Sequence, residues 1–230
     1  MNQSGILTAT FLGLIAAPAL RAQHAPDLTP YLSADRAAEV ALARSAAPRD
    51  VSGAARVLVL TPKGFVEAAA GTNGFTCLVM RSFAAAPGDP QFWNPRTRAP
   101  MCFNPPASHT VLPAQLAQVD WALAGVTGTD LASRIRNAYA EKRFTFPAAG
   151  SMAYMLSPQQ HLADTDPHWM PHLMFFFDRT LTAPTFGAGG FTAPVIDGSA
   201  GDPNAPVQVL FIPVRAWSDG TPAMHASAGK

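Results

Sequence analysis

Residues 55–83 read ARVLVLTPKGFVEAAAGTNGFTCLVMRSF, and this stretch decides the fold class. Short runs rich in Val, Leu and Phe alternate with turn residues, which is typical of strands joined by tight turns. The first turn is predicted at Pro62-Lys63-Gly64. The second is predicted at Asn73-Gly74, because both residues tolerate positive φ. We therefore predict a meander of consecutive antiparallel strands at 57–61, 65–70 and 75–82.

Helical periodicity flanks this stretch on both sides. An Ala-rich helix is predicted at 33–47, with Ser33 as its N-cap. Apolar residues spaced three and four apart predict two more helices at 114–125 and 129–144. Further strands are expected at 151–157, 172–177 and 207–217. Helices and strands that cluster in this way predict an α+β fold with a mainly antiparallel sheet and two to three helices.

A long Pro-rich loop is predicted at residues 84–113, which hold seven prolines. Proline removes an amide donor and restricts the residue before it, so no long helix or central strand is expected there. Farther along, the run HLMFFF at 172–177 has apolar residues at both alternating sets of positions. We therefore predict that it forms a central strand covered on both faces.

The N-terminus indicates export. Residues 1–22 contain an uncharged apolar run of signal-peptide length, and cleavage is predicted after Ala22, with Ala19 as the alternative. An uncleaved N-terminal anchor is the competing interpretation. The remainder, 23–230, is predicted to form a single secreted or periplasmic α+β domain with no membrane span after cleavage.

The charge balance of the chain after residue 22 indicates its class of partner. It carries 15 Lys and Arg against 15 Asp and Glu, once Arg21 is removed from the full count of 16 basic residues. A neutral chain lacks the basic field that nucleic-acid binding requires, so no nucleic-acid partner is expected. The sequence leaves other partners unknown.

The two cysteines, Cys77 and Cys102, are expected to pair. An exported protein meets an oxidising compartment, and an even count usually indicates a disulfide. The alternative is a catalytic Cys77 thiolate with His168 or His172 as its base.

The stretch HLADTDPHWMPHLMFFF at 161–177 concentrates most of the chain's candidate chemistry. A divalent metal such as zinc is one possible ligand, because histidine and carboxylate are its usual donors. However, Pro167 and Pro171 argue against a helix that would place His168 and His172 on one face. In an extended chain those rings lie about 13 Å apart. The leading prediction is therefore no cofactor, with a buried His172 and a more exposed His168. The candidate metal ligands are His161, Asp164, His168 and His172, with Asp166 as a further carboxylate.

A second candidate set consists of three arginines, Arg81, Arg96 and Arg98, near Trp93. Guanidinium groups bind carboxylates and phosphates through paired hydrogen bonds, so these side chains form a candidate anion site. The alternative is that they are loop charges stacked on aromatic rings.

Four segments carry a family resemblance: FWNPRTRAPMCFNP at 92–105, AYMLS at 153–157, HWMPHLMFFF at 168–177 and WSDGTP at 217–222. With them the chain resembles a family of exported bacterial proteins with no known activity. In that family a histidine often stands where this chain has Met170. The resemblance therefore implies export but supplies no reaction, and the methionine weakens a metal site carried over from the family.

No nucleophile elbow, Walker loop or dinucleotide fingerprint occurs in the sequence. The function expected from the sequence is thus an exported binding or envelope-associated module. The alternative is a secreted hydrolase that uses the His/Asp cluster, with or without a metal.

Overall fold

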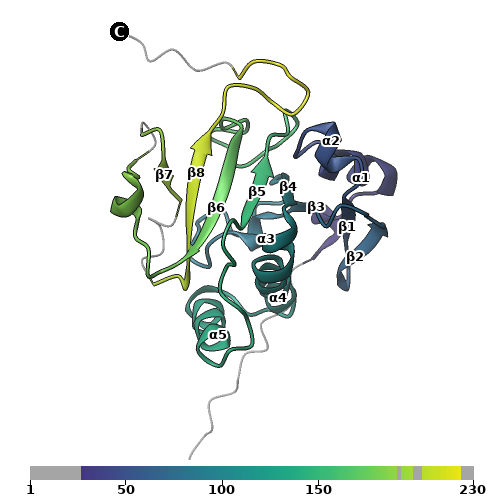
Figure 1. Cartoon of the computed structure of the whole chain (residues 1–230). Helices are drawn as coiled ribbons and strands as arrows, with labels where there is room; N and C mark the ends of the chain where they lie inside the picture. The colour runs from purple at the N-terminus through teal and green to yellow at the C-terminus, as the bar shows by residue number, and fades with distance from the viewer. Residues whose placement is uncertain (1–26, 191–192, 199–203, 224–230) are drawn as a thin grey trace, which may run out of the picture.

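The structure is a computed structural model, and it describes residues 27–190, 193–198 and 204–223 (Figure 1). The proposed signal peptide, residues 1–22, lies outside the described residues. Within these ranges no helix has the length and apolar character needed to cross a membrane.

The described chain forms an α+β structure with a mainly antiparallel sheet, as predicted, and this sheet has eight strands. Five α-helices are described, against the two to three expected. The strands are β1 (Arg56–Thr61), β2 (Gly64–Ala69), β3 (Thr76–Met80), β4 (Ala99–Phe103), β5 (Met152–Met155), β6 (His172–Asp178), β7 (Ile196–Asp197) and β8 (Val207–Pro213). The helices are α1 (Arg36–Arg44), α2 (Arg49–Ser52), α3 (Pro105–Thr110), α4 (Leu112–Leu123) and α5 (Gly128–Ala140), with 3-10 turns η1 (Thr29–Tyr31), η2 (Ser82–Ala84) and η3 (Ala183–Phe186).

The strand order is β2-β1-β3-β4-β5-β6-β8-β7. All neighbouring strands are antiparallel except β1 and β3, which run parallel. The predicted hairpin between β1 and β2 is present, and Gly64 supplies the positive φ of 97° at its turn. The predicted meander was wrong at its second step, because β3 pairs with β1 and leaves β2 at the edge.

The segment around Asn73-Gly74 explains this difference. Gly74 does adopt a positive φ of 76°. However, the Asn73 amide donates to the Val51 carbonyl at 2.7 Å, and the Arg56 amide donates to the Phe75 carbonyl at 2.9 Å. The turn is therefore tied to α2 and to the start of β1, and it carries the chain across that end to the other side of β1.

The Pro-rich segment is more regular than predicted, since β4 and α3 both lie within residues 84–113. The expectation that no central strand fits there was wrong, because β4 lies between β3 and β5. Pro100 of β4 stands opposite Val79, two positions along the ladder from the Cys102–Cys77 pair. The Cα separation of that cysteine pair is 4.0 Å, which is nearer to the ~4.5 Å of a pair whose backbone N–H and C=O point away from the partner strand than to the ~5.5 Å of a hydrogen-bonded pair.

Backbone groups two positions apart on a strand point to the same side. The nitrogen of Pro100, like that of Cys102, therefore points away from β3 and toward β5. The β4–β5 ladder covers only Cys102 and Phe103. On the same side, Arg98 and His161 exchange backbone hydrogen bonds at 2.8 Å each. Pro100 lies between these two pairings, so its missing N–H breaks no described ladder bond.

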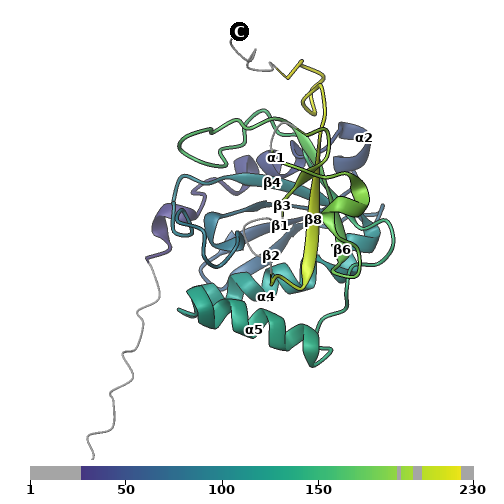
Figure 2. The ribbon, with the colours of Figure 1, turned by 90° about the vertical axis from the view of Figure 1, so that its left-hand side faces the viewer.

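Helices lie on both faces of the sheet (Figure 2). On one face, α1 contacts β1, β3 and β4, and Ala43 of α1, with Ala46 and Ala47 just after it, packs in one cluster with Val57, Val79 and the two cysteines. The N-cap of α1 is Asp35, which accepts from the Ala37 and Ala38 amides, so the prediction of Ser33 was wrong. On the other face, α3 and α4 pack against β-strand side chains such as Leu78, Met101 and Phe103.

The strand HLMFFF is internal to the sheet, as expected, because β6 lies between β5 and β8. Its faces differ in burial. His172 and Phe176 are buried, whereas Leu173, Phe175 and Phe177 on the other face are half-buried. The expectation of full cover on both faces was therefore only partly right.

Cys77 and Cys102 form a disulfide between β3 and β4, as predicted. The described residues contain no free cysteine. A thiolate mechanism at Cys77 would require this bond to be reduced first.

Candidate functional site

The structure separates the histidines that the sequence grouped together. His172 is 1% exposed, and its Nδ1–H donates to the Met170 carbonyl at 2.9 Å. Burial lowers the pKa of His172 to about 4, so the ring is neutral at physiological pH. His168 is exposed, as expected.

His161 and Asp164 form a surface network with Arg96. His161 Nε2 lies 3.1 Å from the Asp164 carboxylate, which also pairs with Arg96. Hydrogen bonds from His161, then from Asn94 and Arg96, lower the pKa of Asp164 to about 2. Asp166 is exposed. Among the described residues, no three His, Cys, Asp or Glu side chains are grouped so that they could hold a metal ion.

The three candidate anion-binding arginines each have protein partners. Arg81 is 1% exposed and donates to the Tyr31 and Val79 carbonyls and to Glu39 Oε1, the last at 2.7 Å. Arg98 donates to backbone carbonyls of its own loop and of Pro30. Arg81 is therefore part of a buried ion pair, and the Arg81–Arg96–Arg98 set gains no support as an anion site.

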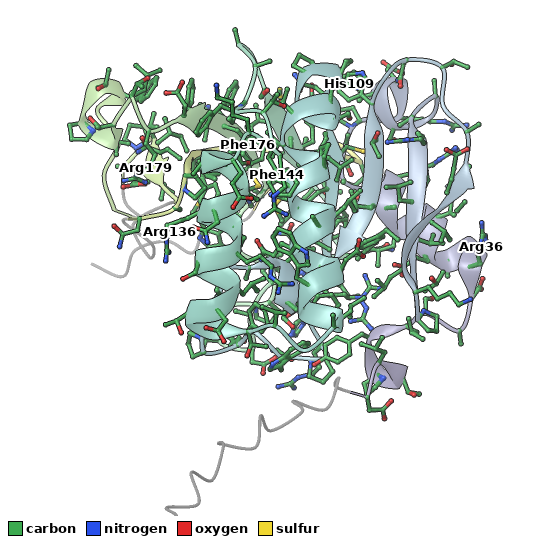
Figure 3. The ribbon with its side chains drawn as sticks, turned by 90° about the horizontal axis from the view of Figure 1, so that it is seen from below. Arg36, His109, Arg136, Phe144, Phe176 and Arg179 are labelled. Carbon is green, nitrogen blue, oxygen red and sulfur yellow. A yellow bond between two sulfur atoms is a disulfide. The ribbon has the colours of Figure 1, made fainter. Side chains whose placement is uncertain are left out.

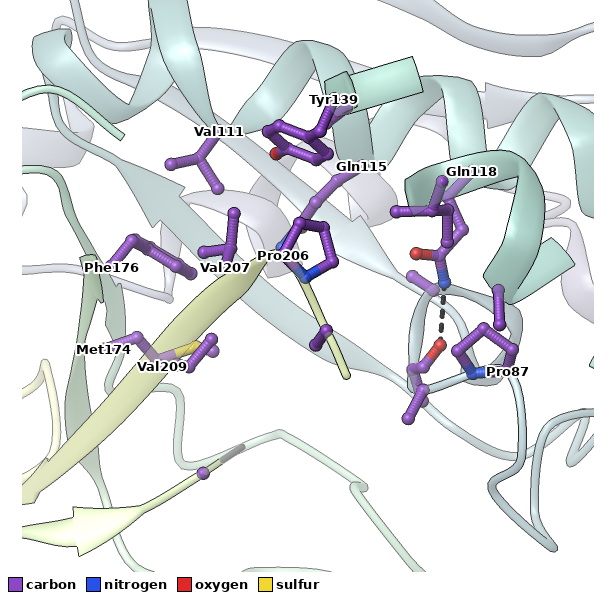
Figure 4. Close-up of a pocket in the computed structure, with 18 of the residues that line it drawn as sticks. Pro87, Val111, Gln115, Gln118, Tyr139, Met174, Phe176, Pro206, Val207 and Val209 are labelled. Atoms are coloured by element: carbon purple, nitrogen blue, oxygen red, sulfur yellow. Dashed lines mark hydrogen bonds between the residues drawn. The ribbon is translucent and has the colours of Figure 1, made fainter. Parts of the chain in front are cut away.

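A cavity elsewhere offers a better site. It has a volume of about 480 Å³ and lies between the helical layer and the C-terminal strands, and we call it the large chamber (Figure 4). In Figure 4, Val111 and Tyr139 lie on the helical side, across the space from Phe176 and Val207. Figure 3 views the protein from the side of α4 and α5, which form this roof.

Strand periodicity makes the floor of the large chamber apolar. Met174 and Phe176 alternate along β6, and their register partners Phe211 and Val209 lie beside them on β8. Side chains two apart on a strand share a face, so all four point to the same side of the sheet. They line the chamber together with Val207.

The roof comes from residues of α4 and α5 at helical spacing. On α5, Ala132, Ile135 and Tyr139 line the chamber, three and four positions apart. On α4, the lining includes Gln115 and Gln118. The wall is the loop 84–87, whose three alanines leave room for the space.

Few polar groups reach this apolar space. The Gln118 amide holds the wall, because it donates to the Ala85 carbonyl at 2.7 Å (Figure 4). Tyr139 is 6% exposed, and burial raises its pKa to about 12, so its phenol stays neutral. Arg136 is exposed at the rim of the chamber.

A smaller cavity of about 230 Å³ adjoins the large one, and we call it the small chamber. The residues that line both are Ala84, Ala85, Asp89, Gln115 and Met174. The small chamber is also lined by Ser82, Thr97 and the buried Arg81.

Sequence reasoning missed both chambers. The helix at 114–125 was predicted from its apolar positions alone. The one available hint was the pair Gln115 and Gln118, which repeats at helical spacing. The large chamber forms where α4 and α5 meet β6 and β8, and these strands follow the two helices by more than thirty residues in the sequence.

Comparisons with protein-family models, with curated proteins and with solved structures find no match.

Proposed function

We propose that the protein is an exported binding module that holds a small apolar molecule in the large chamber. The observation that carries this proposal is the apolar chamber of about 480 Å³ between α4, α5 and the strands β6 and β8. Small-molecule sites are typically concave spaces of roughly 300–1,000 Å³ with apolar walls and few polar groups. The signal-like N-terminus and the disulfide support export, and the resemblance to an exported bacterial family agrees with it.

The alternative, a hydrolase based on the His/Asp cluster, has weaker support. Catalysis requires a nucleophile or activated water near a base and a concave site. His172 is buried against Trp169 and Phe211, whereas His168 is exposed. None of the cluster residues is among those lining either chamber.

The test is titration with N-phenyl-1-naphthylamine, a neutral apolar dye whose fluorescence rises in an apolar site. We expect saturable binding at one site per chain. Ala132→Phe should weaken binding at least tenfold, because the added ring fills the chamber. Ala140→Phe is the matched control, since Ala140 lies on the same helix but does not line the chamber.

Circular dichroism and the unfolding midpoint establish that each variant folds. If Ala132→Phe fails to fold, Ile135→Trp blocks the same space from the next turn of α5. The proposal fails if the wild-type protein shows no saturable binding, or if a folded chamber-filling variant binds the dye as the wild type does.

A further inference from the structure

The large chamber contains a tyrosine hydroxyl that no protein group satisfies. Tyr139 is 6% exposed, and its hydroxyl makes no hydrogen bond within the part of the chain that the structure describes. The oxygen is not sealed inside the protein, since the unpartnered side-chain atoms that lack accessible surface belong to other residues. It therefore opens onto the chamber that Tyr139 lines, and Figure 4 shows the ring extending from α5 into this space. A buried tyrosine hydroxyl usually has a hydrogen-bond partner, so this one points to a polar atom held in the chamber.

The packing around Tyr139 fixes the position of this hydroxyl. Its ring contacts Phe144 edge-on at 5.5 Å and Phe146 at 5.1 Å between ring centroids. Both phenylalanines lie in the segment that follows α5, and their rings restrict the movement of the tyrosine ring. Burial alone raises the pKa of Tyr139, with no hydrogen bond contributing, so the phenol stays protonated. The chamber thus presents a neutral O–H donor in a defined place.

A second unpaired polar group lies on the neighbouring helix. Gln115 of α4 is half-buried, and its amide has no hydrogen-bond partner among the described residues. Gln118, one turn later, differs because its amide is already bonded to the Ala85 carbonyl. Figure 4 shows Gln115 extending from the same side of the space as Tyr139. A side-chain amide offers two N–H donors, so one ligand oxygen beneath α4 and α5 can accept from both residues.

The charges of the lining favour an uncharged ligand. Among the described residues that line the large chamber, only Arg136 and Asp89 are charged, and their charges cancel. Asp89 is half-buried, whereas Arg136 is exposed at the rim, where solvent screens its charge. The buried Arg81 lines only the small chamber. A carboxylate beneath Tyr139 would therefore lose its water without a buried cation in the lining, which costs more than burying a carbonyl oxygen.

We infer that the large chamber binds an apolar molecule with one uncharged hydrogen-bond acceptor, such as a ketone, ester or amide carbonyl, which Tyr139 and Gln115 hold from α5 and α4. This inference rests on the proposed function, because it requires the chamber to bind an apolar ligand. It goes further by naming the chemical class of the ligand and the two residues that select it. Donors placed to bind a ligand oxygen discriminate against an analogue without that oxygen, since they are then left unpaired.

The experiment uses naphthalenes of nearly the same shape as competitors of the naphthylamine dye at pH 8. These are 2-acetylnaphthalene, 2-ethylnaphthalene and 2-naphthoate, which carry a neutral carbonyl, no oxygen and a carboxylate at the same position. We expect Tyr139→Phe and Gln115→Leu each to weaken binding of the acetyl compound about five- to tenfold, which is the loss expected for one hydrogen bond. Affinity for the ethyl compound should change less than twofold in both variants.

Tyr154→Phe is the matched control, because Tyr154 packs on the α1 side of the sheet and lines neither chamber. It makes the same chemical change and should leave every affinity as in the wild type. The unfolding midpoint of ligand-free Tyr139→Phe should be no lower than that of the wild type, since its hydroxyl has no protein partner to lose. A clearly lower midpoint would show a structural partner for this hydroxyl and would overturn the inference.

Two binding results would also overturn it. One is 2-naphthoate binding more tightly than 2-acetylnaphthalene, which would assign an anion to the site. The other is an affinity for the acetyl compound that neither Tyr139→Phe nor Gln115→Leu lowers, which would show that water, and not the ligand, satisfies these groups. Either result leaves the proposed function standing as long as the dye and the ethyl compound bind. Absence of dye binding by the wild type would instead remove the proposed function itself.

Discussion

The environment of His172 makes it sensitive to acid. Its ring lies between Trp169, at 4.6 Å between ring centroids, and Phe211, at 5.1 Å. Burial lowers its pKa from 6.5 to about 4, while the hydrogen bond to the Met170 carbonyl opposes this shift. The neutral form is thus the one that the folded protein accommodates.

This gives a prediction for stability against pH. The unfolded chain binds a proton at His172 near pH 6.5 and the folded chain only near pH 4. The contribution of His172 to the free energy of unfolding should therefore be fully present above about pH 6.5 and should decrease as the pH falls. The loss should reach about 3 kcal/mol near pH 4 and then level off.

Urea unfolding of His172→Phe from pH 8 to pH 4 measures this effect. The variant loses one hydrogen bond at every pH, but its stability should fall less steeply between pH 6.5 and 4 than that of the wild type. His168→Gln is the control, because His168 is exposed and its loss should leave the slope unchanged. Equal slopes for His172→Phe and the wild type would show that His172 is not the group responsible.

The role of Arg81 could not be predicted from its residue type alone. The sequence suggested an anion site, because arginine binds anions well. In the fold, its guanidinium pairs with Glu39, 42 positions away, and both side chains are buried. His172 was different: its position within an apolar run predicted burial correctly. Apolar neighbours in the sequence predict burial, whereas a polar partner from a distant helix leaves no local signal.

At the scale of elements, the two faces of β6 should differ in energetic importance. Phe176 is 2% exposed and stacks on Phe103, with ring centroids 6.0 Å apart. Phe175 points to the opposite face and is half-buried. The strand thus stabilises the fold mainly through the face that meets the helices.

We expect Phe176→Ala to lower the free energy of unfolding by about 3–5 kcal/mol, because it leaves a cavity in the core. The matched variant Phe175→Ala should cost clearly less, since its ring is already partly in contact with solvent. Chemical denaturation of both variants provides the comparison. A Phe175→Ala cost equal to that of Phe176→Ala would show that the second face is as closely packed as the first.

Element boundaries were predictable where a local pattern determines them, and pairing partners were not. The helices at 114–125 and 129–144 correspond to α4 and α5, because apolar spacing specifies them. Asn73-Gly74 correctly marked a turn, but a turn does not determine on which side of β1 the next strand pairs. Pro100 argued against a central strand, yet it occupies a position where the ladder needs no donor.

At the scale of the whole molecule, the sheet has two differently covered halves. Helix α1 covers β1, β3 and β4, and the disulfide lies beneath it, where Cys77 and Cys102 pack with Ala43 and Ala47. The C-terminal strands β6 and β8 meet α4 and α5 across the large chamber. The α+β class followed from the sequence, but the chambers did not, because they depend on how tightly distant layers pack.

The disulfide connects the fold to the proposed export, and this connection can be tested on the whole chain. A bridge closing a loop of 25 residues stabilises by about 3 kcal/mol through the entropy of the unfolded chain. An oxidising compartment forms such a bond, whereas a reducing cytoplasm does not. The full chain and a chain beginning at Gln23 should therefore differ when both are produced in a bacterium.

We expect the full chain to reach the periplasm, to begin at Gln23 by mass spectrometry, and to show no free thiol when denatured without reductant. The chain made without residues 1–22 should stay in the cytoplasm with two free thiols and unfold at lower urea, and oxidation should restore its stability. Cys77→Ala/Cys102→Ala is the control, because its stability should be the same from either compartment. A periplasmic protein with two reactive thiols would contradict the structural disulfide, and a product that keeps Met1 in the membrane fraction would show that the N-terminal segment serves as an anchor.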